Sequence, residues 1–277
     1  MSSNGTAGTH AAADVDGVKD GVLPDGVRNE RGRGIRVAII DSGVHAQHPH
    51  VGGVAGGVAI DPEGHISDDF VDRLGHGTAV AGAIREKAAA AELYAVRVFD
   101  RTLKTHVTSL VVAIEWAVRQ QVHVINLSLG TANPAHEARL ADAVARAQAA
   151  GVVVVAARDD GGTRWLPGCL PGVLSVRADA ACRRDTFQRD PVADAVIFRT
   201  SPYPRPIPGL PPERNLNGVS FAVANMSGFV AAALDACRTG HTLAEAVIAL
   251  DALRPGVCRA VDADPRASVS AIVAELE

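Results

Sequence analysis

Residues 215–233 read NLNGVSFAVANMSGFVAAA, and this stretch decides the fold. A Gly-Val-Ser turn leads into a run of small and apolar residues, which is typical of a central helix packed closely on all sides. Gly218 lets the backbone turn tightly, and Ser220 falls in the first turn of the helix. A serine there lies in the positive field of the helix N-terminus, which suits a nucleophile and an oxyanion. For this stretch alone the simpler explanation is that Ser220 is a helix cap, so the rest of the chain must decide.

The composition indicates one large globular domain. The 277 residues are 47% hydrophobic and 21% charged, which is enough apolar material for a sizeable core. The formal net charge of −4 gives no support for a nucleic-acid or anionic-membrane partner. No apolar run approaches the length of a membrane span. We therefore expect no nucleic acid and no membrane as partner, and the oligomeric state stays open.

The amino-terminal residues lack the features of an export signal. Residues 1–33 are polar and Gly-rich, without a basic start or an apolar segment, and we interpret them as a flexible arm. The four cysteines follow no metal-binding spacing, which favours reduced thiols. They are Cys169, Cys182, Cys237 and Cys258. These features predict a cytoplasmic location and one folded domain over residues 34–277.

Short apolar runs alternate with helical segments along the chain. The runs are continuous, which is typical of strands buried on both faces of a parallel sheet. Expected strands are 36–40, 93–99, 122–129, 151–157, 173–176 and 195–198, and expected helices are 76–92, 108–121, 133–150, 220–233 and 242–253. The Pro-rich segment 201–214 cannot join a sheet interior, and the end of the tail is expected to be helical. The pattern predicts an α/β fold, a central and mostly parallel sheet with helices on both faces.

Polar residues follow several of these strands, and such sheets place their sites at the carboxyl ends of strands. Asp41 ends one run, Ser128 ends another, and Asp159 follows a third. A nucleotide-binding sheet has the same alternation. However, no G-x-G-x-x-G follows the first strand and no P-loop is present, which argues against that class.

Three polar residues stand in short Gly-flanked contexts: Asp41 in IIDSGV, His76 in GHGTAVAG and Ser220 in NGVSFA. Each block alone has a simpler explanation, such as an Asx turn, a helix entry or a helix cap. Together, in the order Asp, His, Ser, they resemble the signature blocks of the subtilases, the subtilisin-like serine peptidases. The resemblance covers 36–253 and includes VINLSLG and WLPGCLPGVLSV.

The resemblance implies a single-domain subtilisin-like fold and a serine endopeptidase. A serine hydroxyl is a poor nucleophile at neutral pH and needs a base within hydrogen-bond reach. Ser220 would be the nucleophile, His76 the general base and acid, and Asp41 the carboxylate that orients the histidine. The substrate would be a peptide or protein, and no cofactor or metal is implied. A small enzyme of this kind could mature one peptide rather than digest many.

The resemblance also implies where a peptide binds, since in the family it lies as an added strand between two edges. The first edge would be Leu103, Lys104 and Thr105, the second Ser128, Leu129 and Gly130, and the wall of the specificity pocket Val155, Ala156 and Ala157. The base of the pocket would lie at about Trp165 to Pro167. Trp165 either makes this pocket shallow, so that it prefers small side chains, or anchors a loop.

The largest departure from the family falls at the oxyanion hole. The family usually has an asparagine there, whose amide donates to the oxyanion, but this chain has Asp159, preceded by Arg158. An ionised aspartate cannot donate and would repel the developing negative charge. Three outcomes stay open. In the first, Asp159 is protonated and donates to the oxyanion. In the second, either Arg158 or the Ser220 N–H alone binds the oxyanion. In the third, the chain is a weak or inactive relative that binds peptides or a partner protein.

Two other features common in the family are not recognised in the sequence. The roughly 35 residues before the first block are too few for a folded, chaperone-like prodomain, so we expect the enzyme to fold unaided. Asp68, Asp69 and Asp72 form an acidic loop. We interpret this loop as a solvated face rather than as a calcium site.

Overall fold

A computed structural model of the protein describes residues 30–160, 162–190, 195–211, 214–236, 241–252 and 275–276. Most of the expected arm, residues 1–29, lies outside this range, as do Cys237 and Cys258. Cys169 and Cys182 carry reduced thiols, as expected. None of the helices in the described ranges is long and apolar enough to cross a membrane.

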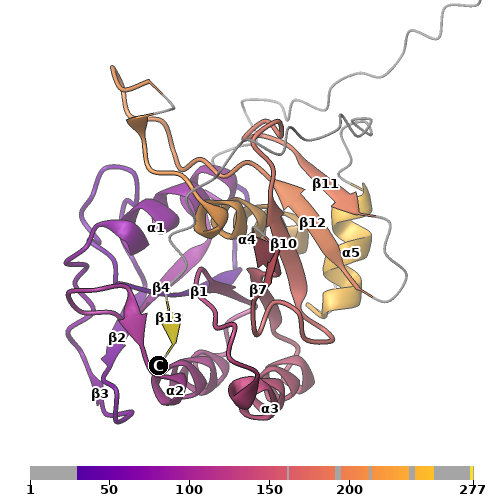
Figure 1. The fold of residues 1–277 in the computed structure, drawn as a ribbon. Helices are drawn as coiled ribbons and strands as arrows, with labels where there is room; N and C mark the ends of the chain where they lie inside the picture. The colour runs from indigo at the N-terminus through magenta and orange to yellow at the C-terminus, as the bar shows by residue number, and fades with distance from the viewer. Residues whose placement is uncertain are drawn as a thin grey trace, which may run out of the picture.

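A nine-stranded sheet runs through the centre of the molecule in the order β11-β12-β10-β7-β6-β1-β4-β2-β3 (Figure 1). Its strands are β1 (Arg36–Asp41), β2 (Gly56–Ile60), β3 (Ile66–Ser67), β4 (Glu92–Arg97), β6 (Val124–Leu127), β7 (Val153–Ala157), β10 (Leu174–Ala178), β11 (Phe187–Asp190) and β12 (Ile197–Thr200). All neighbours from β12 to β2 pair in parallel, and β11 and β3 are antiparallel at the two edges. The expected mostly parallel sheet is confirmed.

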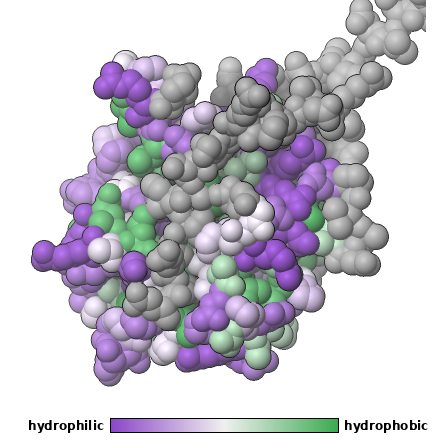
Figure 2. Space-filling view, viewed as in Figure 1, coloured by the Kyte–Doolittle hydropathy of each residue, from purple (hydrophilic) through white to green (hydrophobic). Residues whose placement is uncertain are grey.

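Helices cover both faces of this sheet (Figure 1). They are α1 (His76–Lys87), α2 (Val107–Arg119), α3 (Glu137–Ala149), α4 (Val219–Asp235) and α5 (Leu243–Ala252). Successive residues of β1 alternate between two cores, as the period of a strand requires. Val37 and Ile39 pack in the core with α1, α4 and α5, whereas Ala38 and Ile40 pack in the core with α2 and α3. In Figure 2 hydrophilic residues surround smaller hydrophobic patches on the visible face.

Two short pairings stand apart from the central sheet. β5 (Lys104–Thr105) pairs in parallel with β13 (Glu275–Leu276), and β8 (Asp159–Asp160) forms a hairpin with β9 (Thr163–Arg164). The prediction of a helix at the end of the tail is therefore wrong, because residues 275–276 form a strand. A strand this short takes its conformation from the edge that it pairs with rather than from its own propensity.

The α4 helix is the element that the rest of the chain packs around. It is buried over nearly its whole length and faces α1, α5 and several strands. Its small residues permit close approach. A Cβ atom at Gly228 would lie only 2.8 Å from Cβ of Lys87 and 3.0 Å from the carbonyl oxygen of Ile84. The expectation of a helix packed closely on all sides is confirmed.

Gly228→Val should destabilise the protein, because the added atoms would force α1 and α4 apart. Overpacking of this kind costs about 1–3 kcal/mol. Ala232→Val is the matched control, because it makes a β-branched change at a half-buried position of the same helix. We expect the control to stay within about 0.5 kcal/mol of the parent. Denaturant unfolding measures both values, and equal losses from the two variants would contradict the packing account.

Candidate active site

Asp41 and His76 form a buried pair at the carboxyl end of β1. Asp41 is the last residue of β1, and His76 is the first residue of α1. The two side chains are 0% and 6% exposed. His76 Nδ1 lies 2.7 Å from Asp41 Oδ1. Because a carboxylate only accepts, Nδ1 carries the proton, and Nε2 is the nitrogen that can act as a base.

Backbone packing explains the glycines of the two blocks that carry this pair. A Cβ atom at Gly77 would lie 2.1 Å from the carbonyl oxygen of Gly43, so the two blocks meet where no side chain fits. The Gly77 N–H donates to Ser42 Oγ at 2.9 Å. Ser42 Oγ in turn donates to Asp72 Oδ1 at 2.9 Å. These contacts fix the start of α1, and with it the position of His76.

Asp72 organises this entry, which corrects the interpretation of residues 68–72 as only a solvated face. Its Oδ2 accepts from the backbone N–H and the hydroxyl of Thr78, and its Oδ1 accepts from the N–H groups of Leu74 and Gly75. Asp72 therefore caps the loop that leads into α1. A carboxylate at this point also suits the positive end of the helix.

Ser220 lies in the first turn of α4 and is 1% exposed. Its Oγ donates to the carbonyl oxygen of Ser128 at 3.0 Å, just after the end of β6. The ring of Phe221, the next residue, lies 5.3 Å from the ring of His76. Nε2 of His76 is buried and has no hydrogen-bond partner among the described residues. The hydroxyl is thus turned toward Ser128, and the acceptor nitrogen of the histidine is left open.

The environment of His76 shifts its pKa. Burial acts to lower it, but the charge of Asp41 and the Asp41 hydrogen bond act to raise it, with a further contribution from Asp72. The net result is a pKa above the ordinary value of 6.5. The neutral imidazole that a general base requires therefore becomes dominant only above that value.

Asp159, which the sequence predicts at the position of the usual asparagine, is bound at both oxygens by one arginine. Arg177 Nε donates to Oδ1 at 2.7 Å and Arg177 Nη2 donates to Oδ2 at 2.8 Å. Arg158 Nε lies 3.6 Å from the same carboxylate. A carboxylate held by a guanidinium fork is an acceptor and not a donor. The first of the three outcomes, a protonated Asp159 that donates to the oxyanion, does not fit this arrangement.

The second predicted substrate edge lies beside the predicted base of the pocket. Ser128, Leu129 and Gly130 follow β6, and the backbone of Thr131 exchanges hydrogen bonds of 2.9 and 2.8 Å with Leu166. A Cβ atom at Gly130 would lie 3.3 Å from Cβ of Trp165. Trp165 is half-buried, and its indole Nε1 is buried without a hydrogen-bond partner in the described ranges. Whether Trp165 makes the pocket shallow or anchors a loop remains a prediction.

The first predicted edge, Leu103 to Thr105, is already paired. Lys104 and Thr105 lie opposite Glu275 and Leu276 in the β5–β13 pairing. Leu103 packs against the core with α2 and α3. This edge therefore accepts a parallel strand, although the strand on it belongs to the same chain.

The predicted pocket wall is part of the sheet interior. Val155 and Ala156 are fully buried, one in each core, and Ala157 ends β7. Of the three, Ala157 lies nearest to the segment of the predicted base. A Cβ atom at Gly168 would lie 1.7 Å from the carbonyl oxygen of Ala157. The assignment of these residues to a pocket wall stays a prediction.

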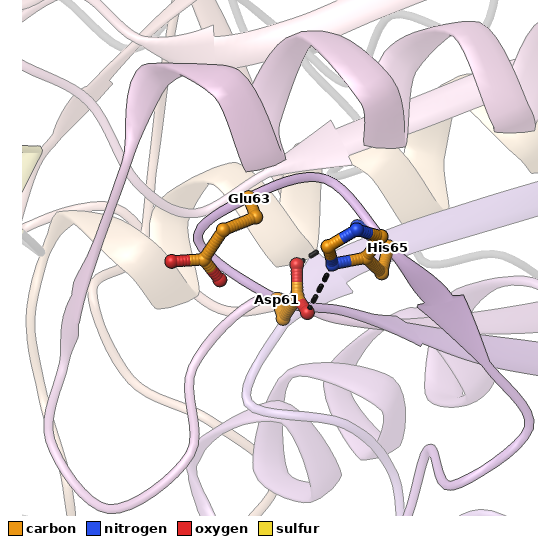
Figure 3. A group of neighbouring side chains, drawn as sticks. All are labelled: Asp61, Glu63 and His65. Atoms are coloured by element: carbon orange, nitrogen blue, oxygen red, sulfur yellow. Dashed lines mark hydrogen bonds and ion pairs between the residues drawn. The ribbon is translucent and has the colours of Figure 1, made fainter.

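One group of exposed side chains has the composition of a metal site. Asp61, Glu63 and His65 place their ligand atoms within 4.8 Å of one another (Figure 3). His65 Nδ1 lies 2.9 Å from Asp61 Oδ2, and the His65 N–H donates to Asp61 Oδ1 at 2.8 Å. These internal bonds are enough to account for the turn between β2 and β3. We do not assign a metal to the group, because exposed acidic clusters are common without one.

Comparison with known proteins agrees with the geometry. The model of the subtilase family matches residues 32–185. Subtilisin Savinase of Lederbergia lenta is 35% identical over 221 residues, which cover 74% of this chain and 77% of that protein. The chain belongs to the subtilase family.

Other relatives of this subtilase are longer. M-protease of Shouchella clausii is 34% identical over 221 residues, or 55% of its length. The thermostable alkaline protease of Halalkalibacterium halodurans is 36% identical over 160 residues, or 42% of its length. The chain thus spans about half the length of these two relatives. A cold-adapted subtilisin-like serine proteinase has a similar fold, with a TM-score of 0.61, 20% identity, and coverage of 79% of this chain and 81% of that one.

Two charged residues with structural contacts in this region were not assigned a role from the sequence. Asp72 lies four positions before His76, and its capping role could have been inferred from the helix start that follows it. Arg177 interrupts the apolar run of β10, LSVRA, which is a recognisable signal for a charged partner. The sequence could not identify that partner, because Asp159 is distant in the chain.

Proposed function

We propose that this subtilase is a serine endopeptidase that cleaves peptide bonds through Asp41, His76 and Ser220. The observation that supports it most is the buried Asp41–His76 pair, which leaves His76 Nε2 open beside the start of α4. Rotation of the Ser220 side chain away from the Ser128 carbonyl would let Oγ donate to Nε2. Catalytic hydrogen bonds often form only when substrate binds.

The reaction proceeds in two halves. In the first, Ser220 Oγ bonds to the carbonyl carbon of the substrate while its proton moves to His76 Nε2. The tetrahedral intermediate then breaks its C–N bond, and the histidine returns the proton to the leaving amine. In the second half, water gives a proton to Nε2 and attacks the acyl-enzyme, which releases the acid and regenerates Ser220. Asp41 holds the tautomer of His76 and stabilises its charged form.

The Ser220 backbone N–H, in the first turn of α4, is the donor that we propose for the oxyanion. The helix field there is positive, which favours a negative charge. With Asp159 bound to Arg177, the side-chain donor of the family is missing. The loss of one such donor lowers kcat by roughly 10²- to 10³-fold in subtilisin. We therefore expect slow turnover rather than none.

Hydrolysis of an unfolded protein such as casein is the experiment that tests this function. Mass spectrometry of the fragments should show new amino termini that increase with time and are absent after treatment with a sulfonyl fluoride. Intact casein after prolonged incubation with folded protein, over a range of pH, would contradict the proposal.

A second candidate function is a peptide-binding subtilase without significant catalysis. Two features favour it: the sequence predicts Asp159, which Arg177 binds, at the asparagine position, and β5 already accepts a strand. In that case, peptide affinity would survive Ser220→Ala and turnover would be undetectable from about pH 4 to 9, the range of the carboxylate and histidine pKa values. A measured turnover number for the unmodified protein would rule this candidate out.

We further propose a selective role, such as maturation of one peptide, with Trp165 limiting the side chain before the cleaved bond. Trp165→Gly should then raise kcat/KM for a substrate with Phe at that position, relative to Ala, by at least about tenfold. Trp116→Phe, in α2, is the control and should leave the ratio unchanged. Kinetics with matched peptides measure it, and an unchanged ratio in Trp165→Gly would show that the tryptophan is a loop anchor.

A further inference from the structure

The carboxylate of Asp72 joins the two segments that carry the buried Asp–His pair. We call residues 41–45 the aspartate segment and residues 75–78 the histidine segment, because each contains one member of the pair. Asp72 Oδ1 accepts from Ser42 Oγ, in the aspartate segment, at 2.9 Å. Asp72 Oδ2 accepts from the hydroxyl and, at 2.9 Å, from the backbone N–H of Thr78, in the histidine segment. One carboxylate thus contacts both segments.

The two hydroxyls that Asp72 holds also connect the segments directly. A hydroxyl that donates its one proton to a carboxylate can only accept at its other contacts. Ser42 Oγ accepts from the Gly77 N–H at 2.9 Å, and Thr78 Oγ1 accepts from the His45 N–H at 3.0 Å. These two bonds cross between the segments in opposite directions. Because Asp72 takes both hydroxyl protons, it fixes the polarity of both bonds.

The Ser42 backbone transmits this arrangement to the pair itself. Its N–H donates at 2.7 Å to Asp41 Oδ1, the oxygen that also faces His76 Nδ1 at 2.7 Å. A Cβ atom at Gly77 would lie 3.2 Å from the same oxygen, so the segments are in close contact at the pair. A shift of one segment against the other would therefore change the distance between Asp41 and His76.

The charge of Asp72 acts on the same histidine. Together with the charge and the hydrogen bond of Asp41, it raises the pKa of His76, whereas burial lowers it. Arg73, the next residue in the chain, pairs instead with Asp69 at 2.6 Å. Asp72 thus has two separable effects on the site, one through its hydrogen bonds and one through its charge.

We propose that Asp72 is a positioning residue of the reaction: by holding the hydroxyls of Ser42 and Thr78, it keeps the aspartate and histidine segments in the register that the Asp41–His76 pair needs. This proposal rests on the proposed endopeptidase function. It gives Asp72 a task beyond capping the loop before α1, because the contacts with the aspartate segment contribute nothing to a helix cap.

Asp72→Asn tests the proposal through the pH profile of kcat. The amide replaces one acceptor oxygen by an NH₂ group, which cannot accept from a hydroxyl. We expect the alkaline plateau of kcat to fall about 10- to 10²-fold, the scale of a small misplacement of reacting groups, with little change in KM. The acid limb should also move to lower pH, because a charge that raises the pKa of His76 is lost. An effect of charge alone would move the limb and leave the plateau unchanged.

Glu245→Gln is the matched control. Glu245 Oε2 accepts from the backbone N–H and the hydroxyl of Thr242 at 2.8 and 2.7 Å, at the start of α5. The control therefore loses the same kind of cap at a different helix. Its kcat should stay within about threefold of the parent value, and its acid limb should stay in place. Equal losses of kcat in Asp72→Asn and Glu245→Gln would overturn the proposal.

Ser42→Ala cuts one of the two links and leaves Asp72 charged. It should lower the plateau of kcat about tenfold without moving the acid limb. This variant carries the test if Asp72→Asn does not fold. The double variant of Ser42→Ala with Asp72→Asn should lose little more kcat than Asp72→Asn alone, because both changes break the same contact. Losses that multiply would show that the two residues act independently, which contradicts the proposal.

The outcomes distinguish failure of this proposal from failure of the proposed function. If the parent protein cleaves casein, and Asp72→Asn is folded by thermal unfolding and keeps the parent plateau of kcat, Asp72 only caps the loop. If the folded parent neither cleaves casein nor reacts with a fluorophosphonate, the endopeptidase function is wrong and the positioning role falls with it.

Discussion

Ser220→Ala should lower kcat by about 10⁶-fold, the scale known for loss of the nucleophile in subtilisin. Ser220 Oγ is the atom that would form the covalent bond to the substrate, and no other buried hydroxyl lies in the first turn of α4. The variant should still bind peptides, because the change removes one oxygen atom and leaves the backbone in place. Steady-state kinetics on a chromogenic peptide measure the loss.

Ser227→Ala is the matched control for this variant. Ser227 lies two turns further along α4, is fully buried, and donates to Asn126 Oδ1 at 2.9 Å. Like Ser220→Ala, the Ser227→Ala variant loses one hydroxyl oxygen and one hydrogen bond donated from α4. We expect near-normal kcat with reduced stability. Activity of Ser220→Ala comparable to that of Ser227→Ala would mean that Ser220 has only a structural role. That role is not the helix cap considered at the outset, because the N-cap of α4 is Gly218.

Asp41→Asn should lower kcat by about 10⁴-fold and move the acid limb of the pH profile to lower pH. The rate falls because an amide at this position favours the wrong tautomer of His76. The limb moves because Asp41 is what raises the pKa of His76, whereas burial, which remains, lowers it. In the parent protein activity should rise with pH through a value above 6.5. In the variant the same rise should occur at lower pH.

Asp69→Asn is the control for the pH shift. Asp69 is an acidic neighbour in the chain, but its carboxylate pairs with Arg73 and Arg97 and has no contact with His76. The acid limb of the pH profile of Asp69→Asn should coincide with that of the parent protein. A limb that stays in place in Asp41→Asn would show that another group sets the pKa of the base.

The sequence was sufficient to predict the helices and strands that are determined by residues close together in the chain. The stretch around Ser220 predicts the central helix, because small residues permit close helix contacts wherever they fall. The two blocks around Asp41 and His76 predict a strand end and a helix start, and the structure places them together. These features depend on residue type and order, which a sequence displays directly.

Pairings between distant segments were harder to predict. Residues 56–60, GGVAI, are not among the strands expected from the sequence, yet they form β2 by pairing with β4. The Gly57 backbone is packed so closely that an added Cβ would lie 2.5 Å from the carbonyl oxygen of Ala95. The Asp159–Arg177 pair is the same kind of case. Each residue alone looks like a departure, and only the register of β7 and β10 brings them together.

This pair changes how the departure at the oxyanion hole is understood. From the sequence, Asp159 could be a protonated donor, could leave the oxyanion to Arg158 or the Ser220 N–H alone, or could be a sign of weak or absent activity. Bound to Arg177, it is a neutralised group that neither donates nor repels strongly. Together with the proposed roles of Asp41, His76 and Ser220, the absence of a side-chain donor at Asp159 leads us to expect a slow protease.

The most direct test of the central claim is labelling with a fluorophosphonate probe, followed by mass spectrometry of the labelled peptide. The probe bonds to a serine only when an adjacent base activates it and an oxyanion can form. We predict a single adduct on Ser220 in the parent protein, none in Ser220→Ala, and strongly slowed labelling in Asp41→Asn. Absence of any adduct on the folded parent protein, or an adduct on a different serine, would contradict the assignment of Asp41, His76 and Ser220 as the active site.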